Sequence, residues 1–407
     1  MKARDAYLSV LKSFKDKEEI KIITGVRRCG KSSLLELFVE YLLASGVPET
    51  RIIRMNFESL RFSHIQNYMD LYRAVSALIS GTEKHYILLD EVQMVENWAR
   101  AIDSFRVDFP ADIYITGSNS RLLSSDFATM LGGRCVEIKM YPLSFKEFLD
   151  FNDFESDAGM ERKFESYLKY GGMPGIVQYN FAQDQINPVL EGIYSTIVLR
   201  DVVERNAVGD QRLLQKLVLF LADNIGSLVS PNSIGNAFVR EKELQIGGKT
   251  KPPAGKTISS YIEALESAYI FYGVPRYDIR GKEYLKTLDK YYIVDTGIRN
   301  ILLGYRDVNR GYLLENIVYF ELRRRGYDVS VGKVGETEID FIAVKPDEKI
   351  YYQVSESIRD EGTRKREIFS LQSAKDNYRK VILTMDRSFV NSYEGIEVKN
   401  LLDFLQE

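Results

Sequence analysis

The sequence has little of several residue types, and each shortage excludes a class of protein. Its two cysteines, Cys29 and Cys135, are too few for a disulfide framework or a zinc site. No apolar run is as long as a membrane-spanning helix, and residues 1–5 lack the apolar stretch of a signal peptide. The two histidines, His64 and His85, have no partner at the spacing of a metal site or catalytic triad. We therefore expect a cytoplasmic protein that has no membrane segment.

The chain also lacks a strong charge of either sign. Its 407 residues include 55 lysines and arginines and 58 aspartates and glutamates, which gives a net charge of −3. A charge this small gives no global case for nucleic-acid binding, so any such site must be local. The hydrophobic content of 45% and the charged content of 28% are ordinary for a folded protein. The length allows two or three domains with cores of their own.

The most informative segment is a glycine loop, GVRRCGKS, that runs from Gly25 to Ser32. It matches the pattern G-x-x-x-x-G-K-[ST]. A β-branched apolar segment at 20–24 precedes it, and a helical pattern at 33–44 follows it. A loop between a strand and a helix is the context in which this pattern binds phosphates, because backbone N–H groups and the helix N-terminus surround them. The sequence therefore predicts a nucleoside triphosphate site.

Individual loop positions have expected roles. Lys31 would reach the β- and γ-phosphates, and the Ser32 hydroxyl would bind Mg²⁺. The remaining residues that we expect around the nucleotide flank these two in the sequence, namely Gly25, Val26, Arg27, Arg28, Cys29, Gly30 and Ser33.

An acidic pair, Asp90 and Glu91, ends the apolar segment at 86–91. An aspartate at a strand tip can hold Mg²⁺, and an adjacent glutamate can orient the attacking water. We assign Asp90 to the metal and Glu91 to the water. Such a pair is otherwise typical of a solvated turn, and the glycine loop upstream favours the functional interpretation.

Small polar residues end the next apolar segment, at 112–120. Ser118 and Asn119 would lie between the glycine loop and the strand that ends in Asp90, where they could sense the γ-phosphate. The alternative is a polar turn that caps the following helix. A further strand is expected at 136–138, after Arg134.

The order of these motifs resembles one known family. The segments GVRRCGKSSLL, YILLDEVQ, ITGSNSRLLS, LGGRCVEI and YPLSFKEFL occur in the order seen in a bacterial and archaeal branch of AAA-like P-loop ATPases. The resemblance implies ATP as the nucleotide, a strand order of 5-1-4-3-2, Asn119 or Ser118 as the sensor, and Arg134 as an arginine finger. A finger acting in trans would require a homo-oligomer. The alternative role for Arg134 is a local salt bridge.

In that family a winged helix and a restriction-endonuclease-like domain follow the core. We therefore expect an α/β protein in four segments: a parallel-sheet AAA-like P-loop core at 1–150, a helical lid or connector at 151–210, a winged helix at 211–300 and an α/β PD-(D/E)xK-like domain at 301–407. A glycine-proline break at 171–174 interrupts the helical pattern of the second segment.

The winged helix makes DNA a possible partner. In such domains the third helix often enters the major groove, so the residues exposed on the helix at 257–265 indicate whether it could bind DNA. The residues expected on its buried face are apolar or aromatic, namely Ile258, Tyr261, Ile262 and Leu265. The opposite face holds Ser259, Ser260, Glu263 and Glu266. Two glutamates repel phosphate, which makes this helix a poor DNA reader. A basic loop before it, with Lys249, Lys251 and Lys256, could still contact a DNA backbone.

The C-terminal segment has a nuclease-like pattern with parts missing. Glu315 on a helix and Asp340 on a strand match the first two metal positions of the PD-(D/E)xK fold. The third element reads Gln353-Val354-Ser355, so a carboxylate and the lysine are absent. Lys345 or Lys349 could replace the missing lysine from another position in the sequence. Nuclease activity is nevertheless the weakest of our hypotheses.

Taken together, the sequence predicts an ATP-binding and ATP-hydrolysing AAA-like enzyme that couples its cycle to DNA. The alternative is a nucleotide-dependent switch that binds a protein partner through its C-terminal half.

Overall fold

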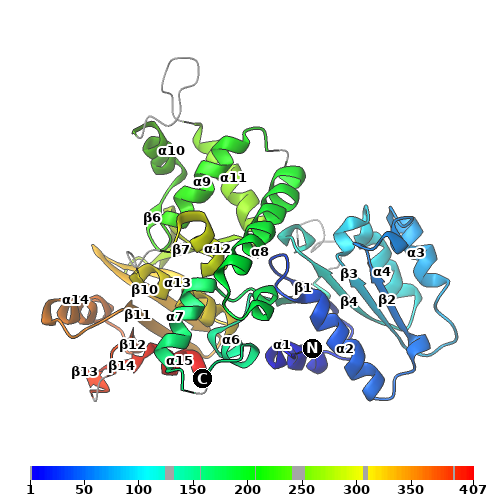
Figure 1. Ribbon diagram of the computed structural model, residues 1–407, viewed down its shortest axis with the longest axis horizontal. Coiled ribbons are helices and arrows are strands. Elements are labelled where there is room, and N and C mark those ends of the chain that lie inside the picture. The colour runs from blue at the N-terminus through cyan, green and yellow to red at the C-terminus, as the bar shows by residue number, and fades with distance from the viewer. Residues whose placement is uncertain are drawn as a thin grey trace. The chain divides into compact units, whose positions relative to one another are not determined.

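The computed structural model describes residues 2–123, 133–155, 157–206, 208–240, 253–305, 310–387 and 390–407. The chain forms two compact units (Figure 1). The first unit contains Met1–Pro142 with Ser267–Tyr269, and the second contains Leu143–Glu266 with Ile270–Glu407. In the part of the chain that is described, no helix is long and apolar enough to cross a membrane.

The first unit is built on a five-stranded parallel sheet. Its strands are β1 (Ile20–Thr24), β2 (Ile52–Asn56), β3 (His85–Asp90), β4 (Ala111–Gly117) and β5 (Cys135–Lys139). They lie in the order β2-β3-β4-β1-β5, and every neighbouring pair is parallel. Read from the other edge, this is the expected order 5-1-4-3-2, so the α/β class of the first segment is confirmed.

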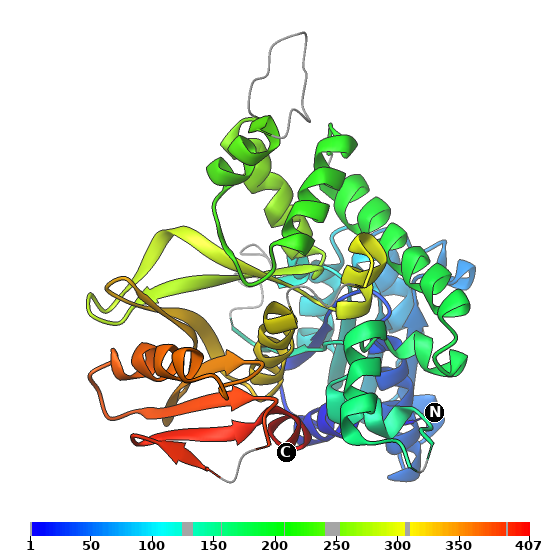
Figure 2. The same ribbon diagram turned by 60° about the vertical axis from the view of Figure 1, so that its left-hand side comes forward.

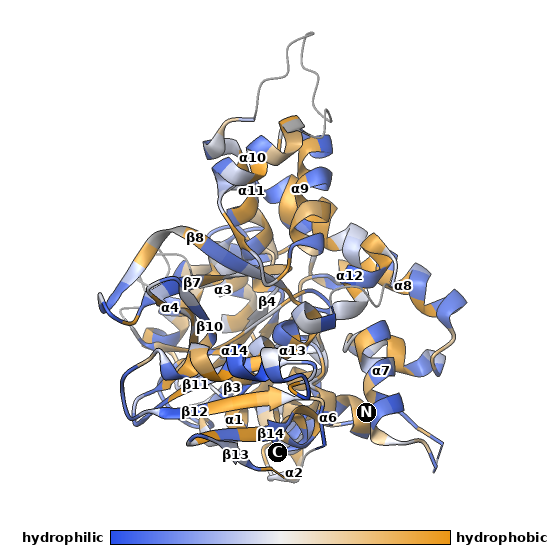
Figure 3. Ribbon diagram, turned by 90° about the vertical axis from the view of Figure 1, so that its left-hand side faces the viewer, coloured by the Kyte–Doolittle hydropathy of each residue, from blue (hydrophilic) through white to orange (hydrophobic). Residues whose placement is uncertain are grey.

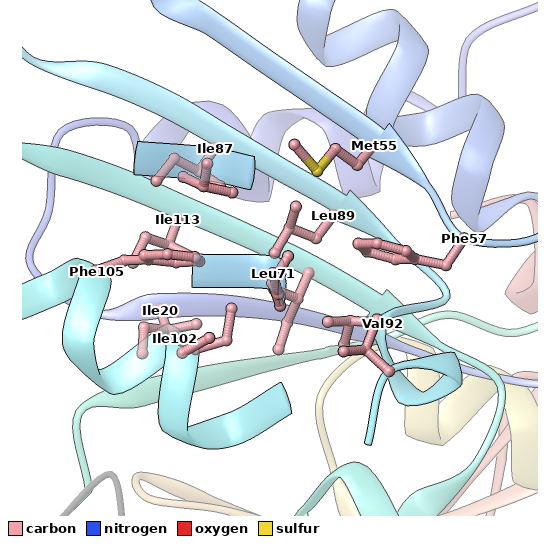
Figure 4. Packing of buried hydrophobic residues seen from close by; sticks show 14 of the residues in the cluster. Ile20, Met55, Phe57, Leu71, Ile87, Leu89, Val92, Ile102, Phe105 and Ile113 are labelled. Carbon is pink, nitrogen blue, oxygen red and sulfur yellow. The ribbon is translucent and has the colours of Figure 1, made fainter. Parts of the chain in front are cut away.

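Helices cover both faces of this sheet. They are α1 (Asp5–Ser13), α2 (Lys31–Ala44), α3 (Tyr68–Ser76) and α4 (Trp98–Asp108), with short 3₁₀ turns at Glu49–Arg51, Leu60–Phe62, Val92–Met94 and Ser120–Leu123. Successive strand residues point to opposite faces. Tyr114 therefore packs on Phe38 of α2, with ring centroids 4.6 Å apart. Its neighbours Ile113 and Ile115 join the core formed with α3 and α4 (Figure 4).

The second unit contains a nine-stranded mixed sheet in the order β13-β14-β12-β11-β10-β9-β7-β8-β6 (Figure 2). The strands are β6 (Leu228–Val229), β7 (Phe271–Asp278), β8 (Glu283–Ile293), β9 (Asp328–Val334), β10 (Thr337–Lys345), β11 (Glu348–Ser355), β12 (Arg379–Thr384), β13 (Ser392–Tyr393) and β14 (Ile396–Asn400). Buried residues of β10, β11 and β12 pack with α14 in one core.

The helical elements of this unit are α6 (Phe145–Phe151), α7 (Met160–Tyr170), η5 (Pro174–Tyr179), α8 (Gln183–Thr196), the π-helix η6 (Ile197–Glu204), α9 (Gln211–Asp223), α10 (Pro231–Arg240), α11 (Gly255–Ser267), α12 (Thr296–Leu303), α13 (Arg310–Arg324), α14 (Glu361–Gln372) and α15 (Leu401–Gln406). The colouring in Figure 3 shows that α14 is largely hydrophilic while the neighbouring β12 is hydrophobic. Lys365 and Arg366 of α14 are accordingly exposed, whereas Ile368 and Leu371 are buried.

The middle and the C-terminal part of the chain share one β-sheet. β7 and β8 pair antiparallel, as expected for a wing, with Phe271 opposite Ile293. However, β7 also pairs in parallel with β9, through Arg276 and Val331. One sheet therefore crosses the boundary expected at residue 300. Backbone hydrogen bonds join the two sides of that boundary, and residues 151–407 lie in one compact unit except for Ser267–Tyr269, which belong to the first unit.

The glycine-rich break after α7 is fixed by a buried carboxylate. Asp295 accepts hydrogen bonds from the N–H of Gly172 at 2.7 Å and from the N–H of Ile298 at 3.0 Å. A Cβ atom on Gly171 would lie 2.2 Å from Asp295 Oδ1, so the close approach requires glycine there. Burial raises the pKa of Asp295 to about 6, although the backbone N–H groups oppose the shift.

Candidate nucleotide site

The glycine loop lies between β1 and α2 and has the backbone that its sequence predicts. Gly25 has a φ of 145° and Gly30 a φ of 104°, conformations that residues with a side chain rarely adopt. A Cβ atom on Gly25 would lie 2.1 Å from the carbonyl oxygen of Met140. Both glycines are therefore required by the path of the loop. α2 begins at Lys31, so its first N–H groups point into the loop without partners inside the helix.

The Lys31 side chain is buried and folds back over the loop. Its Nζ donates to the carbonyl oxygens of Gly25 at 3.0 Å and Val26 at 3.2 Å. Its nearest carboxylate is Glu91, whose Oε1 lies 3.7 Å away. Because most of its partners are neutral carbonyls, the positive charge of Lys31 remains available to an anion.

Asp90 lies at the carboxyl end of β3, beside the loop. Its Oδ1 accepts a hydrogen bond from the hydroxyl of Thr116, and its Oδ2 accepts one from the amide of Asn56 at 2.9 Å. The Ser32 hydroxyl also bonds to Asp90. Burial raises the pKa of Asp90, although the Ser32 and Thr116 hydroxyls lower it. The structure thus brings together Ser32 and Asp90, the two residues expected to hold Mg²⁺.

Glu91 has a φ of 54°, a left-handed conformation that is uncommon outside glycine. Its backbone N–H donates to the Thr116 hydroxyl at 2.9 Å. Its Oε2 accepts hydrogen bonds from the Ser118 hydroxyl at 3.1 Å and from the Gln93 amide. The second oxygen, Oε1, faces Lys31. The hydrogen bonds to Oε2 therefore fix the carboxylate, while Oε1 is directed toward the glycine loop.

The two polar residues after β4 are both buried, with Ser118 at 0% and Asn119 at 2% exposure. Ser118 contacts Glu91 directly, as described above. The order β3-β4-β1 places the end of β4 between the acidic pair and the glycine loop, as the sequence predicts. A role in sensing phosphate stays a prediction.

Arg134 lies elsewhere. It immediately precedes β5 and is exposed, and its carbonyl oxygen accepts the N–H of Ile20 at the start of β1. Since β5 and β1 are parallel, Arg134 is at the amino edge of the sheet and the glycine loop at the carboxyl edge. Arg134 therefore does not face the loop of its own chain.

The other loop residues divide by burial. Val26 and Cys29 are fully buried, and burial raises the pKa of the Cys29 thiol. Arg27 pairs with Glu58 at 2.6 Å, and Arg28 is exposed with a φ of 65°. Ser33 is half-buried in the first turn of α2. The side chains of Val26 and Cys29 are therefore part of the core, and we expect these two residues to contact a phosphate only through their backbone.

Sequence reasoning missed several residues that fix this site. Thr116 bridges Asp90 and the backbone of Glu91, Asn56 holds Asp90, and Gln93 holds Glu91. Arg4 is 4% exposed and donates to the carbonyl of Cys29 at 3.0 Å, which supports the loop from below. Thr116 and Asn56 could have been found, because both are polar residues at the ends of apolar strands.

The nuclease-like residues of the second unit are only partly assembled. Asp340 on β10 lies beside Gln353 on β11, whose Oε1 accepts the Asp340 N–H at 3.3 Å. The two lysines considered as replacements lie on aromatic rings instead: Lys345 is 4.0 Å from the Tyr327 ring, and Lys349 is 4.8 Å from the Tyr378 ring. Neither supplies the missing positive charge.

Two known families match parts of the chain. A family described as an AAA domain matches residues 17–149, which contain the whole parallel sheet. A domain of unknown function, DUF8612, matches residues 161–309.

Similar proteins extend these matches. An uncharacterized protein of Haemophilus influenzae is 43% identical over 407 residues, which is 100% of this chain and 98% of that protein. An uncharacterized protein of Methanocaldococcus jannaschii is 29% identical and covers 88% of this chain and 78% of its own length. Among solved structures, the Walker-type ATPase of Pyrococcus abyssi aligns with a TM-score of 0.50 at 16% identity, covering 74% of this chain and 96% of that one, so the likeness is one of fold. The chain therefore belongs to the same protein family as the Haemophilus influenzae protein, and its residues 17–149 form an AAA domain with the P-loop ATPase fold.

Proposed function

We propose that the first unit binds ATP with Mg²⁺ and hydrolyses it. The observation that supports this most strongly is the convergence of Lys31, Ser32, Asp90 and Glu91 at the carboxyl edge of one parallel sheet. The first two begin α2, and the other two lie at the end of β3. Ligands of open α/β sheets bind at this edge.

The residues present fit a magnesium ion. Ser32 and Asp90 offer a hydroxyl and a carboxylate oxygen, which are the hard ligands that Mg²⁺ prefers. The raised pKa of buried Asp90 fits a position that gains from a nearby cation. When bound, the ion would neutralise charge on the phosphate oxygens.

The other side chains have separate tasks in hydrolysis. Lys31 would exchange its bonds to the Gly25 and Val26 carbonyls for β- and γ-phosphate oxygens. Glu91 would orient a water through Oε1, while Ser118 and Gln93 keep the carboxylate in place. The water oxygen then attacks the γ-phosphorus as the bond to the β–γ bridging oxygen breaks, and the water proton passes toward Glu91.

Ser118 and Asn119 complete the proposal within one chain, as residues that respond to the γ-phosphate. Arg134 could act only on a neighbouring copy, because it lies at the opposite edge of its own sheet. An arginine finger would therefore need a homo-oligomer in which Arg134 reaches the partner copy's nucleotide. The prediction is that Arg134→Ala lowers turnover in the oligomer and leaves ATP affinity unchanged.

The direct test is Lys31→Ala. We expect ATP turnover to be abolished, because removal of the ammonium takes away the main protein charge on the transferred phosphate. The matched control is Lys17→Ala, whose side chain is exposed in the same unit. Undiminished turnover in Lys31→Ala would contradict the proposal.

There are two hypotheses for the process to which ATP hydrolysis is coupled. In the first, hydrolysis is coupled to DNA through the middle of the chain. The buried face of α11 is as expected, but Glu263 is exposed and Glu266 bonds to the N–H of Gly273, so no basic face appears on this helix. Of the three lysines expected in the loop before this helix, Lys249 and Lys251 lie outside the described residues. Lys256 is exposed in the first turn of α11 itself and not in a loop before it.

In the second, the nucleotide state controls binding of a protein partner by the second unit. The acidic outer face of α11 favours this alternative over DNA. ATPase activity measured with and without duplex DNA at several salt concentrations separates the two. DNA coupling predicts stimulation that fades as salt rises, and a protein switch predicts no response to DNA.

A further inference from the structure

The second unit contains an open cavity of about 660 Å³ that no part of the proposed ATPase uses. It is lined by residues of β8, β10, β11, α13 and α14. Five of the lining residues are carboxylic acids and two are basic, so carboxylates outnumber cations by three. The cavity therefore has an excess of negative charge.

A buried lysine from outside the nuclease-like pattern lies at the floor of the cavity. Lys290 of β8 is 3% exposed. Its Nζ is 2.7 Å from a Glu338 oxygen, 3.3 Å from Glu315 and 3.8 Å from Asp340. Its ammonium lies between these carboxylates, where a metal ion would otherwise have to bind. Among the described residues, no group of three or more His, Cys, Asp or Glu is arranged to hold a metal.

One lysine does not balance the carboxylates around it. Burial raises the pKa of Asp340, and repulsion from Glu315 raises it further. Burial also raises the pKa of Glu315, against the opposing effect of Lys290. The carboxylates of the cavity would therefore stabilise a further cation and repel a phosphate group.

Two buried polar groups in the cavity have unused hydrogen-bonding capacity. Gln353 is 8% exposed, and its amide nitrogen donates to none of the described residues, since the only bond of that side chain is the one its oxygen accepts. The Ser370 hydroxyl, on a residue 7% exposed, likewise has no hydrogen-bond partner in the described part of the chain. The Gln353 amide can donate to an acceptor in the cavity, which a peptide carbonyl offers and a bare cation does not.

We propose that this cavity binds a basic peptide segment of a partner protein, whose lysine or arginine side chain meets Glu338, Glu315 and Asp340 while a backbone carbonyl accepts from Gln353. The charge excess selects the basic side chain, and the amide selects a peptide over a simple amine. Lys290 keeps the carboxylates in place and excludes a metal. This inference does not depend on ATP hydrolysis.

The test uses the full chain and a capped Arg-Lys-Arg-Lys peptide in isothermal titration calorimetry. Glu338 lies at the rim, with a side chain 31% exposed, and Glu338→Gln keeps its shape. We expect this substitution to weaken peptide binding at least fivefold. The matched control is Glu394→Gln, in a separate acidic hollow of the same unit, which should leave the affinity within twofold. Spermidine should bind at least fivefold more weakly than the peptide, because it has no carbonyl for Gln353.

Several results would overturn the proposal. They are no peptide binding by the wild type, equal weakening by Glu338→Gln and Glu394→Gln, spermidine binding as tight as the peptide, or Mn²⁺ binding that Glu338→Gln removes. Ser370→Ala is the second variant if Glu338→Gln fails to fold. Ser370→Ala breaks no hydrogen bond within the described part of the chain, and it should also weaken peptide binding.

Discussion

Each unit of the protein buries a lysine beside carboxylates, and the two arrangements differ in which charge is left over. Lys31 in the first unit bonds mainly to backbone carbonyls, and its nearest carboxylate oxygen is 3.7 Å away. Lys290 in the second unit has carboxylate oxygens at 2.7, 3.3 and 3.8 Å. The first arrangement leaves positive charge for a phosphate, and the second leaves negative charge for a cation. The surroundings of a buried lysine, more than its burial, therefore indicate the ligand.

The largest effect on stability should come from Lys290→Met. Removing one partner leaves buried carboxylates uncompensated, which costs about 3 kcal/mol at pH 7. This loss in the free energy of unfolding should become smaller as the pH falls toward 5. Without the lysine the folded-state pKa values of Glu315 and Asp340 rise further, and an acid whose pKa is raised in the folded state stabilises the fold at low pH. Urea unfolding followed by circular dichroism measures both effects.

The matched control for that experiment is Lys365→Met, whose side chain is 75% exposed in an ion pair with Glu361. It should change stability by less than about 0.5 kcal/mol. A comparable loss in both variants would mean that Lys290 is not the main partner of the buried carboxylates.

In the first unit the corresponding change is Glu91→Gln. It keeps the shape of the side chain but cannot accept a proton, so ATP turnover should fall about a hundredfold or more while ATP still binds. The control is Glu96→Gln, on an exposed residue of the same segment. Steady-state phosphate release checks the prediction, and unchanged release would remove Glu91 from the mechanism.

A smaller effect is expected for Thr116→Val. This variant tests whether hydroxyl groups stabilise the buried carboxylates of the first unit, as Lys290 does in the second. Val has the same shape and lacks the hydroxyl that serves Asp90 and the Glu91 backbone. We expect a loss of about 1–2 kcal/mol. The only tryptophan, Trp98, packs on the core of the first unit, so its fluorescence reports the unfolding of that unit. A neutral result would show that Asn56 and Ser32 suffice.

The smallest effect concerns Asp295, a buried carboxylate held by backbone N–H groups instead of a lysine. Its folded-state pKa of about 6 lies above its unfolded value, so its contribution to stability is present at low pH and is lost as the pH rises through 6. Between pH 5 and 6 the loss is about 1 kcal/mol. Asp295→Asn should remove this slope in urea unfolding of the second unit, and an unchanged slope would assign it to other groups.

The sequence was sufficient for the first unit because its signals are local. The glycine loop, the acidic pair at 90–91 and the polar residues at 118–119 each end an apolar strand, and parallel strands bring their carboxyl ends together. The roles of Thr116 and Asn56 were not predicted, because a polar residue at the end of an apolar strand does not by itself indicate which neighbouring side chain it holds. The placement of Arg134 also depends on strand direction: it precedes β5, which is parallel to β1, so it lies at the edge of the sheet opposite the glycine loop.

The second unit was harder to predict because its important contacts join distant parts of the chain. Lys290 reaches Glu315 and Asp340 only because β8 joins a sheet that also contains β10. Local pattern identified the β7–β8 hairpin and the buried face of α11 but not the parallel pairing of β7 with β9. For the same reason the sequence pointed to Lys345 and Lys349, which are close to the nuclease-like motif along the chain, and not to Lys290.

The pairing of β7 with β9 also has a consequence for synthesis. The ribosome releases β7 and β8 before β9, the strand that pairs with the other edge of β7. Until then one edge of β7 presents unpaired N–H and C=O groups, which are a template for association with other chains. The growing protein must therefore keep this hairpin shielded until the C-terminal strands emerge, and translation that stops near residue 300 would leave an aggregation-prone fragment.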